Sequence, residues 1–221
     1  MLPASLRLLV ASVLLLLIPA GLSAAPADWA AEIAALTRGD AANPPAPGGV
    51  VFVGSSSIRL WSTLQEDFPG IPVINRGFGG SQLPDSVHYL DRIVIPYRPR
   101  MVVLYSGEND LAAGKSPADV LGSFQAFRHQ LHAALPQTRL IFLSIKESPS
   151  RERFRAAMRE ANRLVAEVCA TDSRLLFVDV NTPLHDAAGN PRPELFIGDQ
   201  LHLAPAGYVI WKRTLAPHLL P

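Results

Sequence analysis

The sequence predicts a three-layer α/β/α sandwich built around a parallel sheet of five strands. Short apolar runs alternate along the chain with longer stretches in which apolar residues recur at helical spacing. The short runs are continuously apolar, which is typical of strands that are buried on both faces of a sheet. Each run is followed by a candidate helix, and this order indicates parallel strands with helices on both sides.

The expected elements follow one another without an internal repeat. Trp29, Ile33 and Leu36 recur at helical spacing and predict a first helix over residues 27–37, which the Pro- and Gly-rich segment 43–49 separates from the first strand. The expected strands are 50–53, 73–74, 101–105, 140–144 and 175–180. The expected main helices are 57–66, 83–94, 117–135, 151–170 and 205–218.

Composition narrows the class of protein. The chain has 221 residues, of which 48% are hydrophobic and 18% charged, as in one ordinary globular domain with a short apolar leader. Twenty basic side chains nearly cancel nineteen acidic ones, and no run of like charges would follow a phosphate backbone, so we expect no nucleic-acid partner. The single cysteine, Cys169, permits no internal disulfide, and its apolar surroundings predict a buried thiol.

The first residues are typical of a secretory signal peptide. Arg7 precedes an unbroken apolar stretch over residues 8–18, and the small residues 23–25 follow. The apolar stretch is too short to cross ~30 Å of hydrocarbon comfortably, which favours a cleaved leader over a membrane anchor. We therefore expect a signal peptide over residues 1–25, one domain over residues 26–221, and a secreted or periplasmic location without stable membrane insertion.

Polar residues cluster where the predicted strands end. Ligands of open parallel sheets bind beyond the carboxyl ends of the strands, so these positions are the candidates for chemistry. The clusters are 54–57 after the first strand, 75–81 after the second and 106–110 after the third, with a fourth at 199–202 before the last helix.

The residue types in these clusters suit acyl transfer. A serine at the start of a helix is a candidate nucleophile, and a carboxylate three residues before a histidine can hold Nδ1–H and leave Nε2 to take the serine proton. A Gly-Gly turn and an asparagine amide can donate hydrogen bonds to an oxyanion. Each cluster alone also fits a structural role: a helix cap, a surface ion pair or a tight turn.

Together, the four clusters resemble the SGNH/GDSL hydrolase family, in the same order along almost the whole chain after the leader. Residues 51–58 are similar to the family's first block and 75–81 to its second. Residues 107–110 match the Gly-x-Asn-Asp block, and 199–203, followed by Ala-Gly-Tyr at 206–208, match the last. The resemblance implies the three-layer, flavodoxin-like α/β/α fold that the periodicity also predicts.

The resemblance also implies a role for individual residues. Ser56 would be the nucleophile, with Asp199 and His202 completing a triad. The backbone amides of Ser56 and Gly80 and the side-chain amide of Asn109 would form the oxyanion hole. This machinery needs no metal and no organic cofactor.

The first block departs from the family pattern at one position. It usually reads Gly-Asp-Ser, and here Ser55 stands in place of the aspartate. That aspartate is not the triad acid, so the proton relay is unaffected, but the hydrogen bonds that order the turn must differ. Ser55 and Ser57 are rival hydroxyls if the register shifts by one. Glu108 and Ser81 fill positions that vary in the family and are candidates to face the substrate.

The implied function is hydrolysis of carboxylic esters through an acyl-enzyme intermediate. We favour short-acyl esters or O-acetylated glycans, since no long apolar lid insertion separates the blocks, and we expect residues 191–197 to line one wall of the cleft. The alternative is a lysophospholipase or thioesterase acting on lipids. A small-molecule, glycan or lipid ester is the expected partner, and the oligomeric state is left open.

Parts of the sequence also fit three other classes of protein: an α/β-hydrolase, a metal-dependent hydrolase and a non-catalytic binding module. An α/β-hydrolase has the same Ser, acid, His order, but its Gly-x-Ser-x-Gly elbow would need glycine where Ile58 stands. His129 and His132 lie three apart on a predicted helix and could bind a metal, although no third ligand is evident nearby. A non-catalytic carbohydrate- or lipid-binding module could keep the same fold, and a serine-directed fluorophosphonate would leave it unlabelled.

Overall fold

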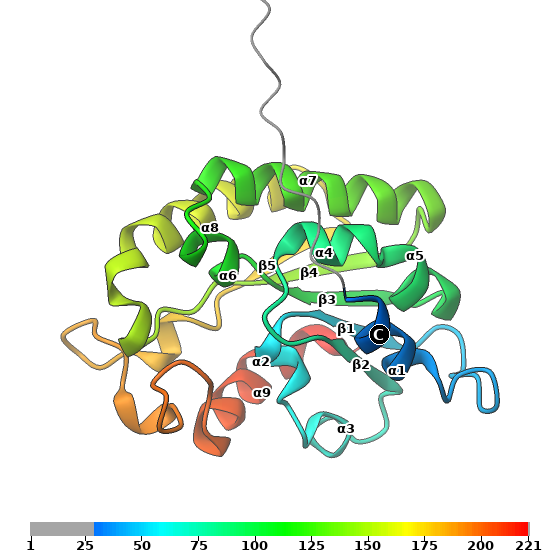
Figure 1. The fold of residues 1–221 in the computed structure, drawn as a ribbon, viewed down its shortest axis with the longest axis horizontal. Coiled ribbons are helices and arrows are strands. Elements are labelled where there is room, and N and C mark those ends of the chain that lie inside the picture. The colour runs from blue at the N-terminus through cyan, green and yellow to red at the C-terminus, as the bar shows by residue number, and fades with distance from the viewer. Residues whose placement is uncertain (1–28, 221) are drawn as a thin grey trace, which may run out of the picture.

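The fold is an α/β sandwich in which one sheet separates two layers of helices (Figure 1). The structure is a computed structural model that describes residues 29–220. The signal peptide expected over residues 1–25 lies outside the described residues and stays a prediction. Within residues 29–220, no helix is both long and apolar enough to cross a membrane.

The sheet has five parallel strands in the order β2-β1-β3-β4-β5. Its strands are β1 (Val50–Gly54), β2 (Val73–Gly77), β3 (Met101–Tyr105), β4 (Arg139–Leu143) and β5 (Leu175–Val178). The predicted fold class and all five predicted strands are therefore confirmed, with ends shifted by up to three residues.

Side chains of alternate residues in the central strands pack into two separate hydrophobic cores. Val51 and Val53 of β1 point into the core beneath one helical layer, whereas Val50 and Phe52 point into the core beneath the other. Every residue of β1 and β3 is buried, which explains why these runs are continuously apolar and do not alternate with polar residues.

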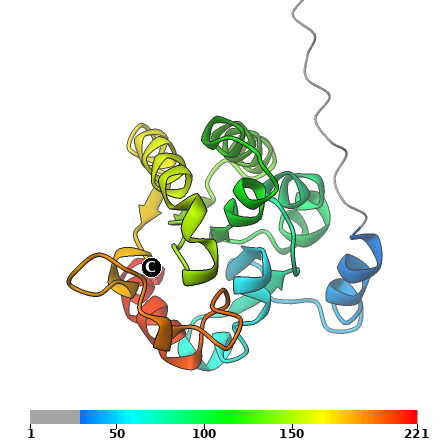
Figure 2. The ribbon, with the colours of Figure 1, turned by 60° about the vertical axis from the view of Figure 1, so that its left-hand side comes forward.

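The two helical layers differ in size (Figure 2). One layer contains α1 (Ala30–Thr37), α4 (Leu83–His88), α5 (Leu90–Ile93), α7 (Pro117–Ala134) and α8 (Arg155–Cys169). The other layer contains α3 (Leu64–Asp67) and the C-terminal helix α9 (Pro205–Leu219). Two short helices, α2 (Ser56–Arg59) and α6 (Glu108–Ala112), directly follow the central strands β1 and β3. Short 3-10 helices lie at η1 (Ile95–Tyr97), η2 (Pro149–Phe154), η3 (Thr182–Leu184) and η4 (Pro193–Leu195).

Local sequence explains the long helices well. Helix α7 begins with a capping box in which Ser116 and Asp119 each accept a backbone N–H from the other, and Pro117 occupies its first position. Helix α8 buries Met158, Ala161 and Val165 along one stripe, the spacing of an amphipathic helix.

Two predicted helices are broken by tertiary packing. The stretch expected over 57–66 is interrupted because Trp61 turns inward and is 1% exposed among the rings of Phe52 and Phe68. The stretch expected over 83–94 breaks at Tyr89, whose ring packs edge-on against Phe78. Helix α6, in the segment expected only as a polar loop, is a further difference.

Candidate active site

The turn after β1 presents Ser56 at the carboxyl edge of the sheet. Gly54 has φ of 137°, and a Cβ at this position would lie 1.8 Å from the carbonyl oxygen of Tyr105 in the neighbouring strand. Only glycine therefore lets β1 pass this close to β3 before it turns. The amide of Ser55 donates to the same carbonyl at 3.0 Å, and Ser56 begins helix α2.

Two hydrogen bonds from outside the turn hold it in place, and a third orients one of the two donors. The Asn75 side chain donates to the Ile58 carbonyl at 2.7 Å and accepts the Gly77 amide at 2.9 Å. The Tyr208 hydroxyl donates to the Ser57 carbonyl at 2.9 Å. The Ser55 side chain makes no capping hydrogen bond to α2. Thus Asn75 and Tyr208 order a turn in which the family's usual aspartate is absent.

A loop between η4 and α9 carries Asp199 and His202. One Asp199 oxygen, Oδ1, accepts the amides of Leu201 at 2.9 Å and His202 at 3.0 Å, and Oδ2 lies 2.6 Å from Nδ1 of the His202 ring. Burial raises the pKa of the Asp199 carboxyl, but the hydrogen bonds from the His202 ring and from the two amides outweigh it and lower that pKa to about 2. The carboxylate is therefore charged at neutral pH and orients the imidazole.

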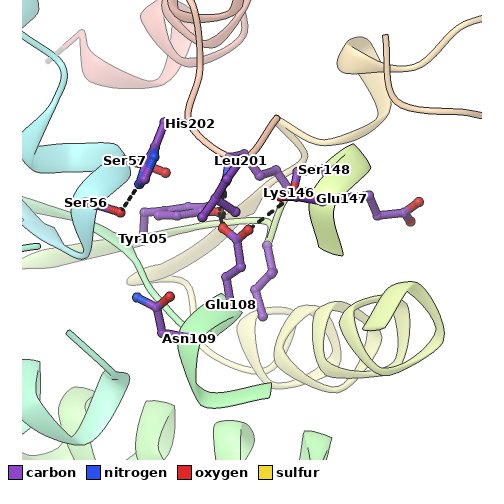
Figure 3. A network of polar contacts seen from close by, with 12 residues as sticks. Ser56, Ser57, Tyr105, Glu108, Asn109, Lys146, Glu147, Ser148, Leu201 and His202 are labelled. Atoms are coloured by element: carbon purple, nitrogen blue, oxygen red, sulfur yellow. Dashed lines mark hydrogen bonds and ion pairs between the residues drawn. The ribbon is translucent and has the colours of Figure 1, made fainter. Parts of the chain in front are cut away.

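The other ring nitrogen of His202 reaches the serine cluster. His202 Nε2 lies 2.8 Å from Ser56 Oγ (Figure 3). The rival serines are almost inaccessible, with Ser55 3% and Ser57 1% exposed. Ser56 is thus the hydroxyl of this cluster that the structure places against the histidine, in a hydrogen-bonded chain that continues to Asp199.

The expected oxyanion donors lie at the same place. A cleft of ≈ 380 Å³ is lined by Ser56, Gly80, Asn109 and His202. Gly80 has φ of 75°, in the region that favours glycine. The Asn109 side-chain amide donates one of its two hydrogens to the Ser81 carbonyl at 2.9 Å. This bond fixes the side chain and leaves the second hydrogen for a ligand.

A family model matches residues 45–210, which include every residue of this cleft from Ser56 to His202. The chain belongs to the GDSL-like lipase/acylhydrolase family. It is therefore an enzyme of a family of esterases and acylhydrolases. No curated protein matches the chain.

Solved structures show the same fold. A Streptococcus pneumoniae protein provisionally named as a platelet activating factor is 24% identical, with a TM-score of 0.76 over 86% of this chain and 92% of that one. A GDSL-like lipase from Bacteroides thetaiotaomicron is 22% identical, with a TM-score of 0.69 over 85% and 98%. An acetylxylan esterase from Geobacillus stearothermophilus, solved as a catalytic mutant, is 17% identical, with a TM-score of 0.64 over 79% and 95%.

This GDSL-like enzyme has cleft residues that sequence reasoning missed. Glu32 from α1, Arg59 from the end of α2 and Arg151 from η2 all line the cleft. The Glu32 carboxylate accepts the amide of Gly79 at 3.1 Å, directly before the expected donor Gly80. Glu32 lies outside the matched segment, and no motif marks it, because only the folded chain brings α1 to this edge of the sheet.

Three expectations about the cleft are wrong. Glu108 is 5% exposed and pairs with Lys146 in the interior, and Ser81 is fully buried with its hydroxyl donating to the Phe78 carbonyl. Neither faces a substrate, because each side chain is turned inward to satisfy an interior partner. The segment 191–197 is not among the residues that line the cleft, because the residues that the chain between η4 and α9 contributes to the lining are Leu201 and His202.

The histidines considered as metal ligands have other partners. His129 lies 3.2 Å from the Arg128 guanidinium, and His132 Nε2 lies 3.0 Å from the Thr138 carbonyl. Across the described part of the chain, no group of three or more His, Cys, Asp or Glu side chains is arranged to hold a metal ion. Cys169 is buried and unpaired, as expected.

Proposed function

We propose that the protein hydrolyses carboxylic esters with short acyl groups through an acyl-enzyme formed on Ser56. The observation that carries this proposal is the chain of contacts from Ser56 Oγ to His202 Nε2 at 2.8 Å and from His202 Nδ1 to Asp199 at 2.6 Å, which opens onto the cleft lined by Gly80 and Asn109. A nucleophile, a base, an orienting carboxylate and amide donors thus converge on one point.

In the proposed reaction, His202 acts first as base and then as acid. Its Nε2 takes the Ser56 proton while Oγ bonds to the ester carbonyl carbon. When the tetrahedral intermediate collapses, the bond to the alcohol oxygen breaks and His202 gives its proton to that oxygen. Water then enters and gives a proton to His202 as its oxygen bonds to the acyl carbon. The bond from that carbon to Ser56 Oγ breaks, His202 returns the proton to Ser56 Oγ, and the acyl group leaves as a carboxylic acid. Asp199 stabilises the imidazolium in both halves of the reaction.

Three donors are proposed to hold the oxyanion. The Ser56 amide belongs to the first turn of α2, where backbone N–H groups have no acceptor within the helix. The Gly80 amide and the remaining Asn109 hydrogen complete the set. Donors that are fixed before the reaction stabilise the charge as it develops, and each is typically responsible for about 10²- to 10³-fold in rate.

The lining of the cleft supports a small acyl group and a polar alcohol. Charged side chains of Glu32, Arg59 and Arg151 line the cleft together with the expected nucleophile, and among the described residues of the lining Leu201 is the one large aliphatic side chain. A long hydrocarbon chain would find little apolar surface there, whereas hydroxyl groups would find donors and acceptors. O-acetylated glycans have this chemistry, and the fold of the acetylxylan esterase named above accommodates such a substrate.

The test is hydrolysis of p-nitrophenyl esters from acetyl to palmitoyl, with Ser56→Ala and Ser55→Ala assayed beside the wild type. We expect kcat/KM to be greatest for the shortest acyl chains and to fall at least about 10³-fold in Ser56→Ala. Ser55→Ala is the matched control and should keep activity within about tenfold of wild type. Undiminished activity in Ser56→Ala would contradict the mechanism.

The same assay separates the alternatives. A maximum at palmitoyl would favour a lipid acylhydrolase. No hydrolysis of any ester, together with no labelling by a fluorophosphonate, would favour a non-catalytic binding module.

We also propose that the enzyme is secreted or periplasmic, on the basis of the apolar leader before residue 26. N-terminal sequencing of the protein recovered from outside the cytoplasm tests this, and we expect a start between residues 25 and 28. Recovery of an intact Met1 in the cytoplasm would contradict it.

A further inference from the structure

Three charged or polar side chains form a closed cluster beneath the cleft (Figure 3). Tyr105 ends β3, Glu108 begins α6, and Lys146 lies three residues beyond the end of β4. Glu108 Oε2 accepts the Tyr105 hydroxyl at 2.7 Å and the Lys146 ammonium at 2.6 Å. The Lys146 side chain is 1% exposed and that of Glu108 is 6% exposed. None of the three lines the cleft or takes part in the proposed proton transfers.

The protonation state of Tyr105 sets the direction of its hydrogen bonds. Burial, together with the negative charge of Glu108, raises the pKa of the Tyr105 hydroxyl well above its usual value of 10, so the group stays protonated and donates to Glu108. The backbone carbonyl of Tyr105 accepts the amide of Ser55, the residue before the expected nucleophile, at 3.0 Å. Tyr105 therefore connects the turn before α2 to Glu108 and Lys146.

A buried ion pair of this kind adds little net stability, because the cost of removing two charges from water offsets their attraction. Its main consequence is geometric. Glu108 is held from two sides, by Tyr105 and Lys146, and Ser148 Oγ lies 3.5 Å from its second oxygen. The first turn of α6 is thereby fixed relative to the ends of β3 and β4.

The next two residues of α6 fix the loop that carries Gly80. Asn109 donates to the Ser81 carbonyl at 2.9 Å, and Asp110 Oδ2 accepts the Leu83 amide at 3.0 Å. All three expected oxyanion donors are thus connected to α6: Ser56 by way of Ser55 and Tyr105, Gly80 by way of Ser81, and Asn109 directly.

We propose that Tyr105, Glu108 and Lys146 form a positioning network that holds the Asn109 amide at the correct distance from the Ser56 turn. This inference rests on the proposed function, since it concerns the donors of that same oxyanion hole. The network makes no contact with the cleft and acts only by fixing α6 against α2. Its loss should therefore weaken stabilisation of the transition state and leave ground-state binding of the substrate nearly unchanged.

The first test is Tyr105→Phe, which removes the hydroxyl and keeps the ring that packs on Trp211 at 4.9 Å. Tyr97→Phe is the matched control, because the Tyr97 hydroxyl also bonds to both members of an ion pair, the partly buried Arg76 and Asp40, away from the cleft. For p-nitrophenyl acetate we expect kcat to fall roughly tenfold in Tyr105→Phe and KM to stay within about twofold of wild type. The decrease in kcat should be smaller than the ~10²- to 10³-fold loss that follows when an oxyanion donor is removed, because Asn109 is displaced and not lost. Tyr97→Phe should lower the urea midpoint of unfolding by about as much as Tyr105→Phe does, and it should keep kcat within about twofold of wild type.

The second test asks whether the effect passes through Asn109. In an Asn109→Ala background, Tyr105→Phe should lower kcat by less than about twofold, because the donor that it positions is already gone. If the two effects multiply, the network acts elsewhere and the proposal is wrong.

A similar kcat in Tyr105→Phe and wild type would also overturn the proposal, and so would a rise in KM at constant kcat. Either result leaves the proposed function intact, because the wild-type enzyme would still hydrolyse the ester. Inactivity of the wild type itself, by contrast, would count against the proposed function.

Discussion

The two sides of the candidate active site are built in different ways. Ser56 follows a fully buried strand, and its neighbours Ser55 and Ser57 are at most 3% exposed. Asp199 lies in a surface loop with 43% of its side chain exposed, and its carboxylate accepts hydrogen bonds from residues 201 and 202 of the same loop. The nucleophile side therefore depends on the packing of the sheet, whereas the acid and base side depends on a local turn.

This difference predicts that catalysis and stability can be separated on one side of the cleft and not on the other. Changes in the Asp199 loop should reduce activity with little effect on folding. Changes at the end of β1 should reduce both.

The largest effect is expected from Asp199→Asn. The amide can still accept the two backbone N–H groups, but it no longer compensates the charge of the imidazolium or enforces its tautomer. We expect kcat for p-nitrophenyl acetate to fall about 10⁴-fold, with the free energy of unfolding within about 1 kcal/mol of wild type. A large loss of stability in urea would show that the loop is not independent of the core.

Asn109→Ala is expected to have the next largest effect. Loss of a side-chain donor should lower kcat by about 10²- to 10³-fold with little change in KM, because the bond strengthens only in the transition state. The kcat of Asn109→Asp should be lower still, since its carboxylate would repel the oxyanion. Steady-state kinetics measure both variants, and a decrease of less than about threefold in Asn109→Ala would remove this residue from the oxyanion hole.

Gly54→Ala tests the buried side. A methyl group there would lie 1.8 Å from the Tyr105 carbonyl oxygen, and φ of 137° is unfavourable for alanine. We expect the free energy of unfolding to fall by at least about 3 kcal/mol. Gly198→Ala is the control in the exposed loop: it has no atom within 4 Å of the new carbon and should change stability by less than about 0.5 kcal/mol. Equal effects in urea denaturation would contradict the contrast.

The smallest effect concerns acid stability. The pKa of Asp199 is about 2 in the folded protein, below the ~3.9 of an unfolded chain. Its ionised form therefore contributes stability that is fully present above about pH 5 and is lost as the pH falls toward 2. The decrease in urea midpoint between pH 5 and pH 3 should be smaller in Asp199→Asn than in wild type, and parallel decreases would argue against a lowered pKa.

The contrast also explains what could be predicted from the sequence. The five strands and the long helices α7 and α8 were predictable, because buried runs and amphipathic stripes leave a local pattern. Ser56, Asn109 and His202 were predictable because each stands in a short motif directly after a strand or before a helix. The pattern fails where packing decides, as at Trp61 and Tyr89, whose burial breaks the helices expected there.

Contacts between distant segments left no local signal. Lys146 lies in the polar segment that follows β4, and nothing in that segment distinguishes it from an ordinary loop after a strand. It pairs with Glu108 only because β3 and β4 are neighbours in the sheet. The same holds for Glu32, which reaches the amide of Gly79 across 47 residues of sequence. Glu108 could therefore be singled out from the sequence, but its interior role could not.

The most direct test of the central claim is to map the residue that a fluorophosphonate modifies, by digestion and mass spectrometry of the labelled protein. We predict a single modification on Ser56 in the wild type and its loss in His202→Ala, because the histidine supplies the base that activates the hydroxyl. Modification of Ser55 or Ser57, or no modification of a protein that still hydrolyses p-nitrophenyl acetate, would contradict the assignment of Ser56 as the nucleophile.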